Sequence, residues 1–404
     1  MTEFSTMFED TRLTAYLILL KYYVIPRTRL RALVSRIIGK QEPTLQHMLA
    51  NATIRWLSST LSIHQFRALS SGQCDANALL QNCPTLLEEK ATAETIVGED
   101  YRGHFLVKYP NPTHTIFYVY GGGFVSGSPG SVMPYLLQLS VELQARGFKA
   151  DMFVAEYDLA PEYPYPGALR QVISAYRYIA SRKISIILAG DSAGGNLCLG
   201  LLRHLVKPHP SIPPLIQSQG ETGRVVAACL NSPWVNLRNN GESYRQNANQ
   251  DCLDKGALDR WRKAYLDRKP LDEYTNPIDC LDDWKEILPK DTLLVAGDLE
   301  LFVADIQKLA QNIHKLSLPP GVIGDSETNC HSRVDIIISR RTWSLRKDMF
   351  GVWLTLGVHN LGYQRVGEDK TRITRIPAFT YRLTGLLTDV ESEKRRWMYV
   401  SRMI

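Results

Sequence analysis

The most constraining stretch of the sequence is a short apolar segment that passes through a glycine-rich turn directly into a helical pattern. Residues 184–189 have the length and β-branched content of a buried strand, residues 190–195 read Gly-Asp-Ser-Ala-Gly-Gly, and helical spacing follows over 197–206. A strand that turns straight into a helix forces its corner residue into a strained backbone conformation, which is tolerated when the flanking positions lack side chains. The corner residue is Ser192, and its hydroxyl should stand out of the sheet, above the N-terminus of the next helix.

Short apolar runs alternate with helical patterns along most of the chain. The β-rich runs lie at 105–109, 115–120, 150–157, 184–189, 224–230 and 291–296, and helical spacing occurs at 135–143, 168–180, 197–206 and 306–316. This alternation is typical of βαβ units. The sequence therefore predicts an α/β fold with a mostly parallel central sheet and helices on both of its faces.

Two regions depart from this alternation. Residues 1–95 are expected to form helices, broken by Pro26, Pro43 and Pro84, and residues 236–287 are expected to be a helical insertion between strands. Together they are predicted to form a helical cap over the carboxyl edge of the sheet. The α/β domain proper is expected to span 96–404, with an atypical C-terminal segment at about 319–404.

Composition excludes several classes of protein. Hydrophobic residues make up 44% and charged residues 22% of the 404, which is typical of a globular chain rather than a disordered or fibrous one. The net charge is +6, but the segment from Arg333 onward has 14 Lys and Arg against 7 Asp and Glu, so it carries +7 and the remainder −1. No aromatic or glycine pattern of a nucleic-acid motif accompanies this basic segment, so no nucleic-acid partner is expected.

The seven cysteines are too sparse for a disulfide scaffold, and no Cys-x-x-Cys pair indicates a metal site. They predict free thiols in a reducing compartment, and hence a cytoplasmic protein without a metal. The apolar stretch 13–25 contains Lys21, ends at Pro26 and is shorter than the ~20 residues of a membrane span. An amphipathic helix is expected there, either packed on the domain or lying on a membrane surface. The oligomeric state is left open.

The turn at residues 190–194 matches the pattern G-x-S-x-G between a strand and a helix, which is typical of a serine nucleophile. The alternative is a phosphate-binding loop, but this sequence has neither the Lys that follows the glycines of such a loop nor the G-x-G-x-x-G spacing. A second glycine motif, Gly121-Gly122-Gly123, directly follows another strand, seventy residues before the turn. Consecutive glycines let backbone N–H groups converge on one oxygen, so this loop is predicted to form an oxyanion hole.

Four motifs in order resemble those of the hormone-sensitive-lipase-like α/β-hydrolases. They are the glycine triplet, the stretch Tyr157-Asp-Leu-Ala-Pro-Glu-Tyr-Pro-Tyr-Pro166, the turn at Ser192, and Ser232-Pro233-Trp234. The resemblance covers about residues 100–310, and the helical N-terminus is similar to fungal esterase and steryl-deacetylase-like members. It implies the α/β-hydrolase fold and a Ser-His-Asp/Glu hydrolase acting on carboxylic esters, with no cofactor.

The resemblance also assigns roles to individual residues. N–H groups of Gly121, Gly122 and Ala193 are the expected oxyanion donors. The family's leading His is replaced here by Tyr120, which puts in question how firmly the loop is held. Aligning the segment after 291–296 on Asp305 places the catalytic acid at Glu300, with Asp298 as the alternative. The acid would orient the imidazole and stabilise the imidazolium.

The catalytic histidine should follow the acid in the chain. His359, in a glycine-His turn, resembles the family pattern best, and His314 and His331 are the alternatives. His359 lies 59 residues after Glu300, farther than is usual in the family, and residues 319–356 account for the surplus. Either this stretch is a surface insertion, or the tail has diverged or been mistranslated and the native histidine turn is lost.

The expected activity is hydrolysis of esters through an acyl-enzyme. The apolar N-terminal cap favours a bulky apolar substrate with a short acyl group, such as a sterol-like or secondary-metabolite acetate. Two alternatives use the same fold. One is acyl transfer or lactone chemistry in a biosynthetic pathway, and the other is non-catalytic binding of a small molecule.

Overall fold

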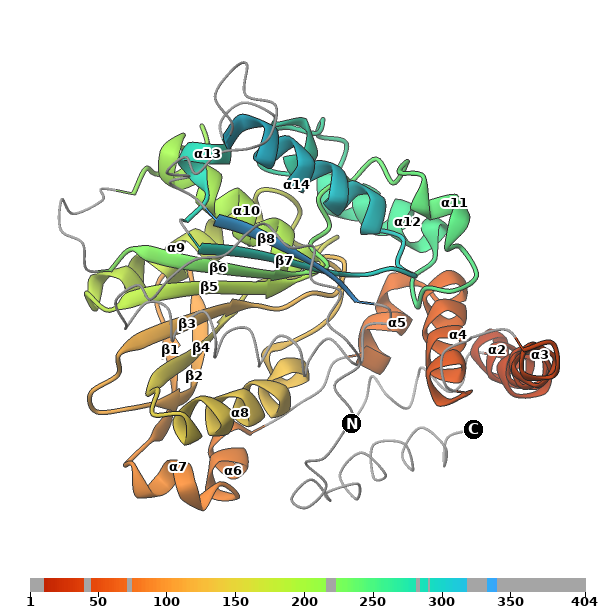
Figure 1. The fold of residues 1–404 in the computed structure, drawn as a ribbon, viewed down its shortest axis with the longest axis horizontal. Coiled ribbons are helices and arrows are strands. Elements are labelled where there is room, and N and C mark those ends of the chain that lie inside the picture. The colour runs from red at the N-terminus through yellow and green to blue at the C-terminus, as the bar shows by residue number, and fades with distance from the viewer. Residues whose placement is uncertain are drawn as a thin grey trace.

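An eight-stranded sheet forms the centre of the molecule (Figure 1). The structure is a computed structural model that describes residues 11–39, 45–70, 75–215, 223–280, 284–289, 291–317 and 333–339. The strand order is β1-β2-β4-β3-β5-β6-β7-β8. The first two pairings, β1 with β2 and β2 with β4, are antiparallel, and every later pairing in this order is parallel.

The six strands expected from apolar runs are all present, and two more extend the sheet at its edges. The strands are β1 (Thr92–Val97), β2 (Arg102–Lys108), β3 (His114–Val119), β4 (Ala150–Glu156), β5 (Ser185–Asp191), β6 (Val225–Asn231), β7 (Asp291–Gly297) and β8 (Arg333–Ser339). Because β3 and β5 to β8 run parallel, their carboxyl ends meet along one edge of the sheet. The loops that carry Gly121, Ser192 and Glu300 leave from this edge.

Helices lie on both faces of the sheet, which confirms the expected α/β architecture. Those that connect the strands are α8 (Pro129–Ala145), α9 (Gly167–Ser181), α10 (Ala193–Val206), α13 (Trp284–Ile287) and α14 (Val303–Ser317). Figure 1 shows α8 on one face and α10, α13 and α14 on the other, and α9 packs beside α10. One continuous apolar core joins the two layers, from Leu80 to Ile313. It includes residues before position 95, and β1 runs through that expected boundary.

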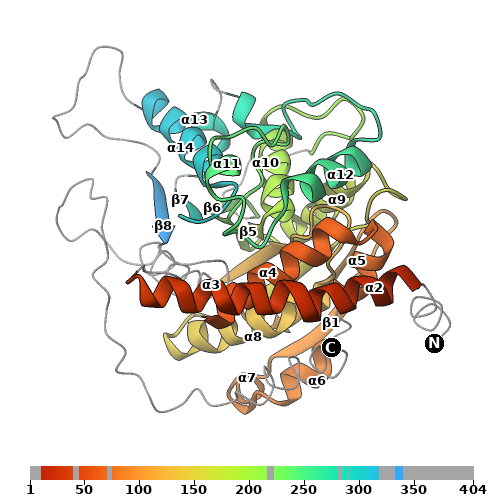
Figure 2. The same ribbon diagram turned by 90° about the vertical axis from the view of Figure 1, so that its right-hand side faces the viewer.

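Helices α2 to α5 and the insertion lie beside the carboxyl edge of the sheet, whereas α6 and α7 pack against α8, and α6 also against β1 and β2 (Figures 1 and 2). The N-terminal elements are α2 (Thr11–Leu19), a π-helical turn η1 (Leu20–Val24), α3 (Ile25–Ile37), α4 (Leu45–Thr60), α5 (Ile63–Ser70), α6 (Ala76–Gln81) and α7 (Pro84–Glu88). The insertion contains α11 (Ser243–Gln246), α12 (Lys255–Leu266) and the 3₁₀ turn η2 (Pro277–Asp279).

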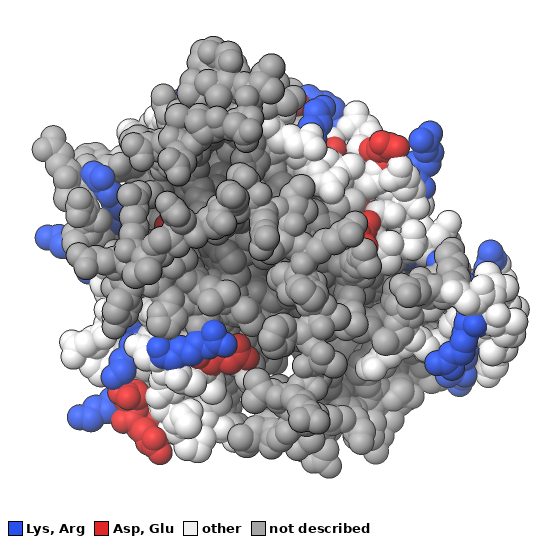
Figure 3. All heavy atoms as spheres, viewed as in Figure 1, with Lys and Arg blue, Asp and Glu red and all other residues white. Residues whose placement is uncertain are grey.

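The expectation that Pro26 ends the first helix is wrong. Pro26 is the second residue of α3, and α2, η1 and α3 form one rod on the outer side of α4 and α5 (Figure 2). Proline is tolerated in the first turn of a helix because its missing N–H would have no helical partner there, and the wider turn η1 lies directly before it. Lys and Arg side chains lie along the outer edge of the rod (Figure 3). Among the described helices, none is both long and apolar enough to cross a membrane.

Candidate active site

Ser192 occupies the sharp corner between β5 and α10. Its backbone has φ 52° and ψ −118°, a strained conformation for a residue with a side chain. The N–H of Ser192 donates to the carbonyl of Asn231 at 3.0 Å, which ties the corner to the end of β6. Its side chain is partly exposed, and its hydroxyl has no hydrogen-bond partner among the described residues. The hydroxyl therefore stands clear of the sheet at its carboxyl edge, as expected.

The glycines around Ser192 allow the backbone to pass closely. A side-chain carbon added at Gly194 would lie 2.5 Å from the Tyr120 carbonyl, and one added at Gly195 would lie 2.8 Å from Pro233 Cβ. A carbon added at Gly121 would lie 3.0 Å from Ser192 Cβ, so the glycine loop after β3 lies directly against the corner. Gly122 has φ 131°, which favours glycine. The two glycine motifs thus meet in space, as the sequence predicted.

The N–H of Gly121, expected as an oxyanion donor, is already engaged. It donates to Asp191 Oδ1 at 3.0 Å, and the Tyr118 hydroxyl donates to the same oxygen at 2.8 Å. The N–H groups of Gly122 and Gly123 have no acceptor among the described residues, and Ala193 is the first residue of α10, where no intrahelical bond uses the N–H. The Gly121 N–H is therefore used within the fold, whereas the N–H groups of Gly122, Gly123 and Ala193 are open on the side of Ser192.

Tyr120, which replaces the family's histidine, is fixed by its counterpart in the next motif. The Tyr120 hydroxyl donates to the Tyr157 carbonyl at 3.1 Å, and the Tyr157 hydroxyl donates to the Tyr120 carbonyl at 2.8 Å. The two rings stack with centroids 4.5 Å apart. Burial raises the pKa of both hydroxyls, so both stay protonated and able to donate. The loop is therefore held by a reciprocal pair of tyrosines instead of a histidine.

Glu300 lies buried in the turn between β7 and α14. Its Oε2 accepts from the Ser232 hydroxyl at 2.8 Å and from the Gly297 N–H at 3.1 Å. Ser232 directly follows Asn231, whose carbonyl accepts from the N–H of Ser192. The carboxylate of Glu300 is thus linked to the corner through one neighbouring strand end. The alternative acid, Asp298, is only partly buried, and its carbonyl oxygen accepts from the Asn247 amide at 3.0 Å.

Residues of the insertion hold the turn that carries Glu300. The Asn247 amide donates to the carbonyls of both Asp298 and Glu300, at 3.0 and 2.9 Å. Asp251 Oδ2 accepts from the Leu301 N–H at 2.6 Å, and the Ser243 hydroxyl donates to the Leu301 carbonyl. Sequence reasoning missed these contacts because nothing in the local pattern around 243–251 shows which loop its polar side chains face.

The N-terminal helices reach both sides of this arrangement. On α4, the Arg55 guanidinium donates to the Asp251 carbonyl. On α5, Arg67 Nε donates to the Val125 carbonyl at 2.8 Å, directly after the glycine loop, and Phe66 packs against Trp261 with ring centroids 5.3 Å apart. Trp261 lies over Gly123, where an added side-chain carbon would collide with the indole.

Of the three candidate histidines, only His314 lies on a described element. It is on α14, 11 residues beyond the start of the helix, or about 16 Å along its axis. Because β7 and β8 are parallel, α14 runs back toward the amino edge of the sheet and carries His314 away from Ser192. His331 and His359 lie outside the described residues. In β8, Ser339 pairs with Gly297, so the chain is back at the carboxyl edge of the sheet 20 residues before His359.

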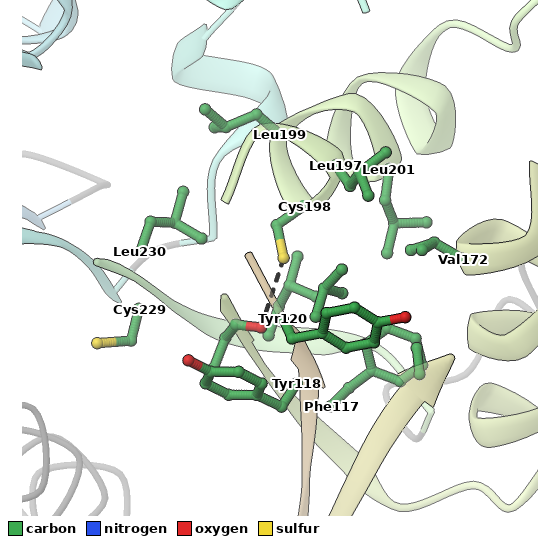
Figure 4. Close-up of a cluster of buried hydrophobic side chains, with 14 of the residues drawn as sticks. Phe117, Tyr118, Tyr120, Val172, Leu197, Cys198, Leu199, Leu201, Cys229 and Leu230 are labelled. Atoms are coloured by element: carbon green, nitrogen blue, oxygen red, sulfur yellow. Dashed lines mark hydrogen bonds between the residues drawn. The ribbon is translucent and has the colours of Figure 1, made fainter. Parts of the chain in front are cut away.

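The core behind the corner is apolar. Figure 4 shows Cys198 pointing from α10 toward Tyr118 and Tyr120, and its thiol donates to the Ala189 carbonyl at 3.5 Å. Burial raises the pKa of the Cys198 thiol, which keeps it protonated and unreactive.

The five cysteines of the described residues are all free thiols. Within the same residues, no cluster of His, Cys, Asp and Glu has the arrangement of a metal site.

Sequence comparison identifies a known family. The profile described as the alpha/beta hydrolase fold matches residues 116–320, about half of the chain. An esterase of Acinetobacter venetianus is 31% identical over 216 residues, which cover 52% of this chain and 64% of the esterase. Mouse hormone-sensitive lipase is 39% identical over 97 residues, 22% of this chain and 12% of the lipase, and an acetyl-hydrolase of Streptomyces hygroscopicus is 29% identical over 172 residues, 41% of this chain and 52% of the hydrolase. The chain spans less than two thirds of each of these relatives.

Solved structures confirm the fold. An esterase from the bacterial hormone-sensitive lipase family aligns with a TM-score of 0.56 and 19% identity, covering 80% of this chain and 98% of that one. An esterase/lipase from an uncultured bacterium aligns with a TM-score of 0.54 and 20% identity, covering 74% and 90%. The family resemblance inferred from the four motifs is confirmed by the matching profile and the curated relatives, and these structures confirm the fold.

Proposed function

The chain belongs to the α/β-hydrolase family, with the motifs of its hormone-sensitive-lipase-like members, and on that premise we propose that it is a serine hydrolase of carboxylic esters. The strained, partly exposed corner at Ser192 carries the proposal, because a G-x-S-x-G turn between a strand and a helix presents the serine nucleophile in α/β-hydrolases. The glycine loop against Ser192 Cβ supplies the matching place for the oxygen of a tetrahedral intermediate.

Ser192, His359 and Glu300 form the proposed catalytic triad. For Glu300, the support is its burial, its hydrogen bond from Ser232 and its position at the same sheet edge as Ser192. For His359, the support is chain order and the return of β8 to that edge at Ser339. Glu300 would hold the imidazole in the tautomer that accepts the Ser192 proton, and would stabilise the imidazolium that forms.

In the reaction, the Ser192 oxygen attacks the ester carbonyl while His359 takes the hydroxyl proton. The oxyanion is stabilised by the N–H groups of Gly122, Gly123 and Ala193, each worth about 3–4 kcal/mol of barrier. The C–O bond to the alcohol breaks, and the alcohol leaves with the proton from the imidazolium. Water then attacks the acyl-enzyme by the same route, which releases the acid and restores Ser192. The residues supply every proton transfer, so the mechanism uses no cofactor.

The proposed substrate is the ester of a bulky apolar alcohol with a short acyl group, such as the acetate of a sterol-like molecule or a secondary metabolite. Its support is the aromatic pair of Phe66 and Trp261, which packs from α5 and α12 over the glycine loop. Aromatic side chains beside the reacting carbonyl favour apolar groups.

Hydrolysis of p-nitrophenyl acetate, followed by release of nitrophenolate, tests the proposal. We expect steady turnover by the wild-type chain and its loss in Ser192→Ala. Among the variants His359→Ala, His331→Ala and His314→Ala, only the first should lose activity. Absence of turnover in the wild type would overturn ester hydrolysis, and full activity in all three histidine variants would overturn the assignment of the base.

A further inference from the structure

The rod formed by α2, η1 and α3 presents an apolar stripe to its surroundings. Of the sixteen large apolar side chains exposed on the described residues, nine lie between positions 18 and 38. Six of them recur at helical spacing, and their exposed fractions range from 46% at Leu19 to 73% at Ile37. They are Leu19, Tyr22, Tyr23, Leu30, Leu33 and Ile37. A contiguous stripe of this kind on a surface helix marks an interaction site rather than scattered exposure.

The other face of the rod is used for packing within the molecule. Leu20 and Ser35 are buried, Arg31 donates to the Asn249 carbonyl at 3.1 Å, and α3 packs along α4. The rod is therefore fixed on the domain by one face, and the stripe points away from the domain. Figures 1 and 2 agree that no described element lies beyond it.

The charges beside the stripe have one sign. Residues 11–39 contain six Lys and Arg and no Asp or Glu. Arg27, Arg29 and Arg36 are exposed on the two flanks of the stripe and form no ion pair with a described acidic residue. The edge of the molecule formed by the rod shows basic spheres and no acidic ones in Figure 3. Arg27 also donates to the Tyr23 hydroxyl at 2.7 Å, so this aromatic ring and this positive charge lie side by side on the rod.

We propose that this stripe docks on a lipid surface that carries anionic headgroups, with the rod lying in the plane of the interface. Apolar side chains would enter the acyl boundary, while the flanking Arg side chains extend to the phosphates. Tyr22 and Tyr23 suit the depth between the acyl chains and the phosphates, because each has an apolar ring and a polar hydroxyl. A second copy of the chain is the poorer occupant, because pairing two such stripes would bring two uniformly basic faces together.

Docking would also place the candidate active site beside the lipid, an extension that rests on the proposed function. The rod packs on α4, whose Arg55 contacts the segment that holds the Glu300 turn, and α5 contacts the glycine loop. An apolar ester dissolved in the membrane would then reach the site without crossing much water.

Flotation of the full chain with lipid vesicles tests the docking. We expect at least tenfold stronger binding to phosphatidylcholine vesicles with about 30% phosphatidylserine than to pure phosphatidylcholine, and weakening of that binding as salt is raised from low to high concentration.

The double variant Leu30→Glu with Ile37→Glu should lose at least tenfold in binding. The triple variant Arg27→Gln, Arg29→Gln, Arg36→Gln should lose the preference for anionic lipid. Val97→Glu, an equally exposed apolar position on β1, is the matched control and should bind as the wild type does.

Equal binding of the stripe variant and the wild type, or no binding of the wild type to either vesicle, would overturn the proposal. So would a concentration-dependent dimer in sedimentation that Leu30→Glu with Ile37→Glu dissociates, because a second copy would then occupy the stripe. Hydrolysis of p-nitrophenyl acetate, a soluble ester, should be the same in these variants as in the wild type. Failure of docking and failure of the proposed activity are therefore separate results.

Discussion

Ser192 and Glu300 lie 108 residues apart in the chain and meet in the fold through one small side chain, the hydroxyl of Ser232. Ser232 follows the strand end that accepts the Ser192 N–H, and it donates to the Glu300 carboxylate. The Ser-Pro-Trp motif after β6 therefore has a structural role at the site: its serine fixes the carboxylate that we assign as the catalytic acid.

The two candidate acids should respond differently to neutralisation. Glu300→Gln should lower kcat/KM by about 10³–10⁴, because the amide cannot stabilise the imidazolium. Asp298→Asn should lower kcat/KM by less than about tenfold, because Glu300 still supplies the negative charge that stabilises the imidazolium. Steady-state rates with p-nitrophenyl acetate compare the two variants, and the opposite order would exchange the two assignments.

The tyrosine pair should contribute to stability more than to chemistry. Tyr120→Phe removes the donor to a buried carbonyl of Tyr157, and should lower the free energy of unfolding by about 1–2 kcal/mol. Tyr163→Phe, at an exposed tyrosine six residues beyond Tyr157, should change it little. Urea unfolding measures both variants, and equal losses would show that the reciprocal hydrogen bonds do not hold the loop.

The sequence was sufficient to place Ser192, because its strain arises from a local strand-turn-helix pattern that neighbouring residues determine. It was not sufficient to orient the glycine loop. Asp191, at the end of the neighbouring strand β5, accepts from the N–H of Gly121 and leaves the next two amides as the proposed donors. A pattern of glycines predicts an oxyanion loop without identifying its donors.

Among the elements, the central strands were predictable and the edge strands were not. β3 to β7 are buried on both faces and appear in the sequence as continuous apolar runs. β1, Thr92–Val97, is mostly exposed and mixes polar with apolar residues, so it gives no such signal. The rod through Pro26 was missed for another reason: the π-helical turn that precedes the proline has no sequence signature.

The insertion should act as a positioning element for the acid turn. Asn247→Ala removes an amide that donates to two carbonyls of that turn. It should lower kcat by about 10–100-fold with KM little changed, because the change misplaces the Glu300 carboxylate and leaves substrate binding intact. Gln246→Ala, at an exposed neighbour bonded only to Glu242 among the described residues, is the matched control. A rise in KM at constant kcat would show that the insertion contacts substrate instead.

The N-terminal helices α4 and α5 connect to both halves of the candidate site. Arg55 of α4 donates to the segment that holds the Glu300 turn, and Arg67 of α5 donates to Val125, which follows the loop of the proposed oxyanion donors. Two of the helices predicted to form a cap thus contact the loops that carry the proposed site residues. These contacts join residues about 60 to 200 positions apart, and no local pattern predicts such pairings.

Alkaline pH should destabilise the molecule through its buried tyrosines. Burial raises the pKa of Tyr118, Tyr120, Tyr157, Tyr244 and Tyr265 above the ordinary value near 10. Their contribution is complete below pH ~10 and is lost as pH rises toward the folded pKa, because the unfolded chain ionises first. Each adds up to about 1.4 kcal/mol per pH unit to the loss. Urea midpoints should therefore fall steeply above pH ~10, and less steeply in Tyr120→Phe. Midpoints that stay constant to pH ~11 would contradict this.

The proposed function requires that Ser192 is an activated nucleophile at the carboxyl edge of the sheet. Its most direct test is mass-spectrometric mapping of the adduct after brief exposure of the folded full chain to a fluorophosphonate. We expect a single phosphonylated residue, Ser192, and no adduct in Ser192→Ala or after urea unfolding. An unmodified Ser192, or a label spread over several serines at similar rates, would contradict this expectation.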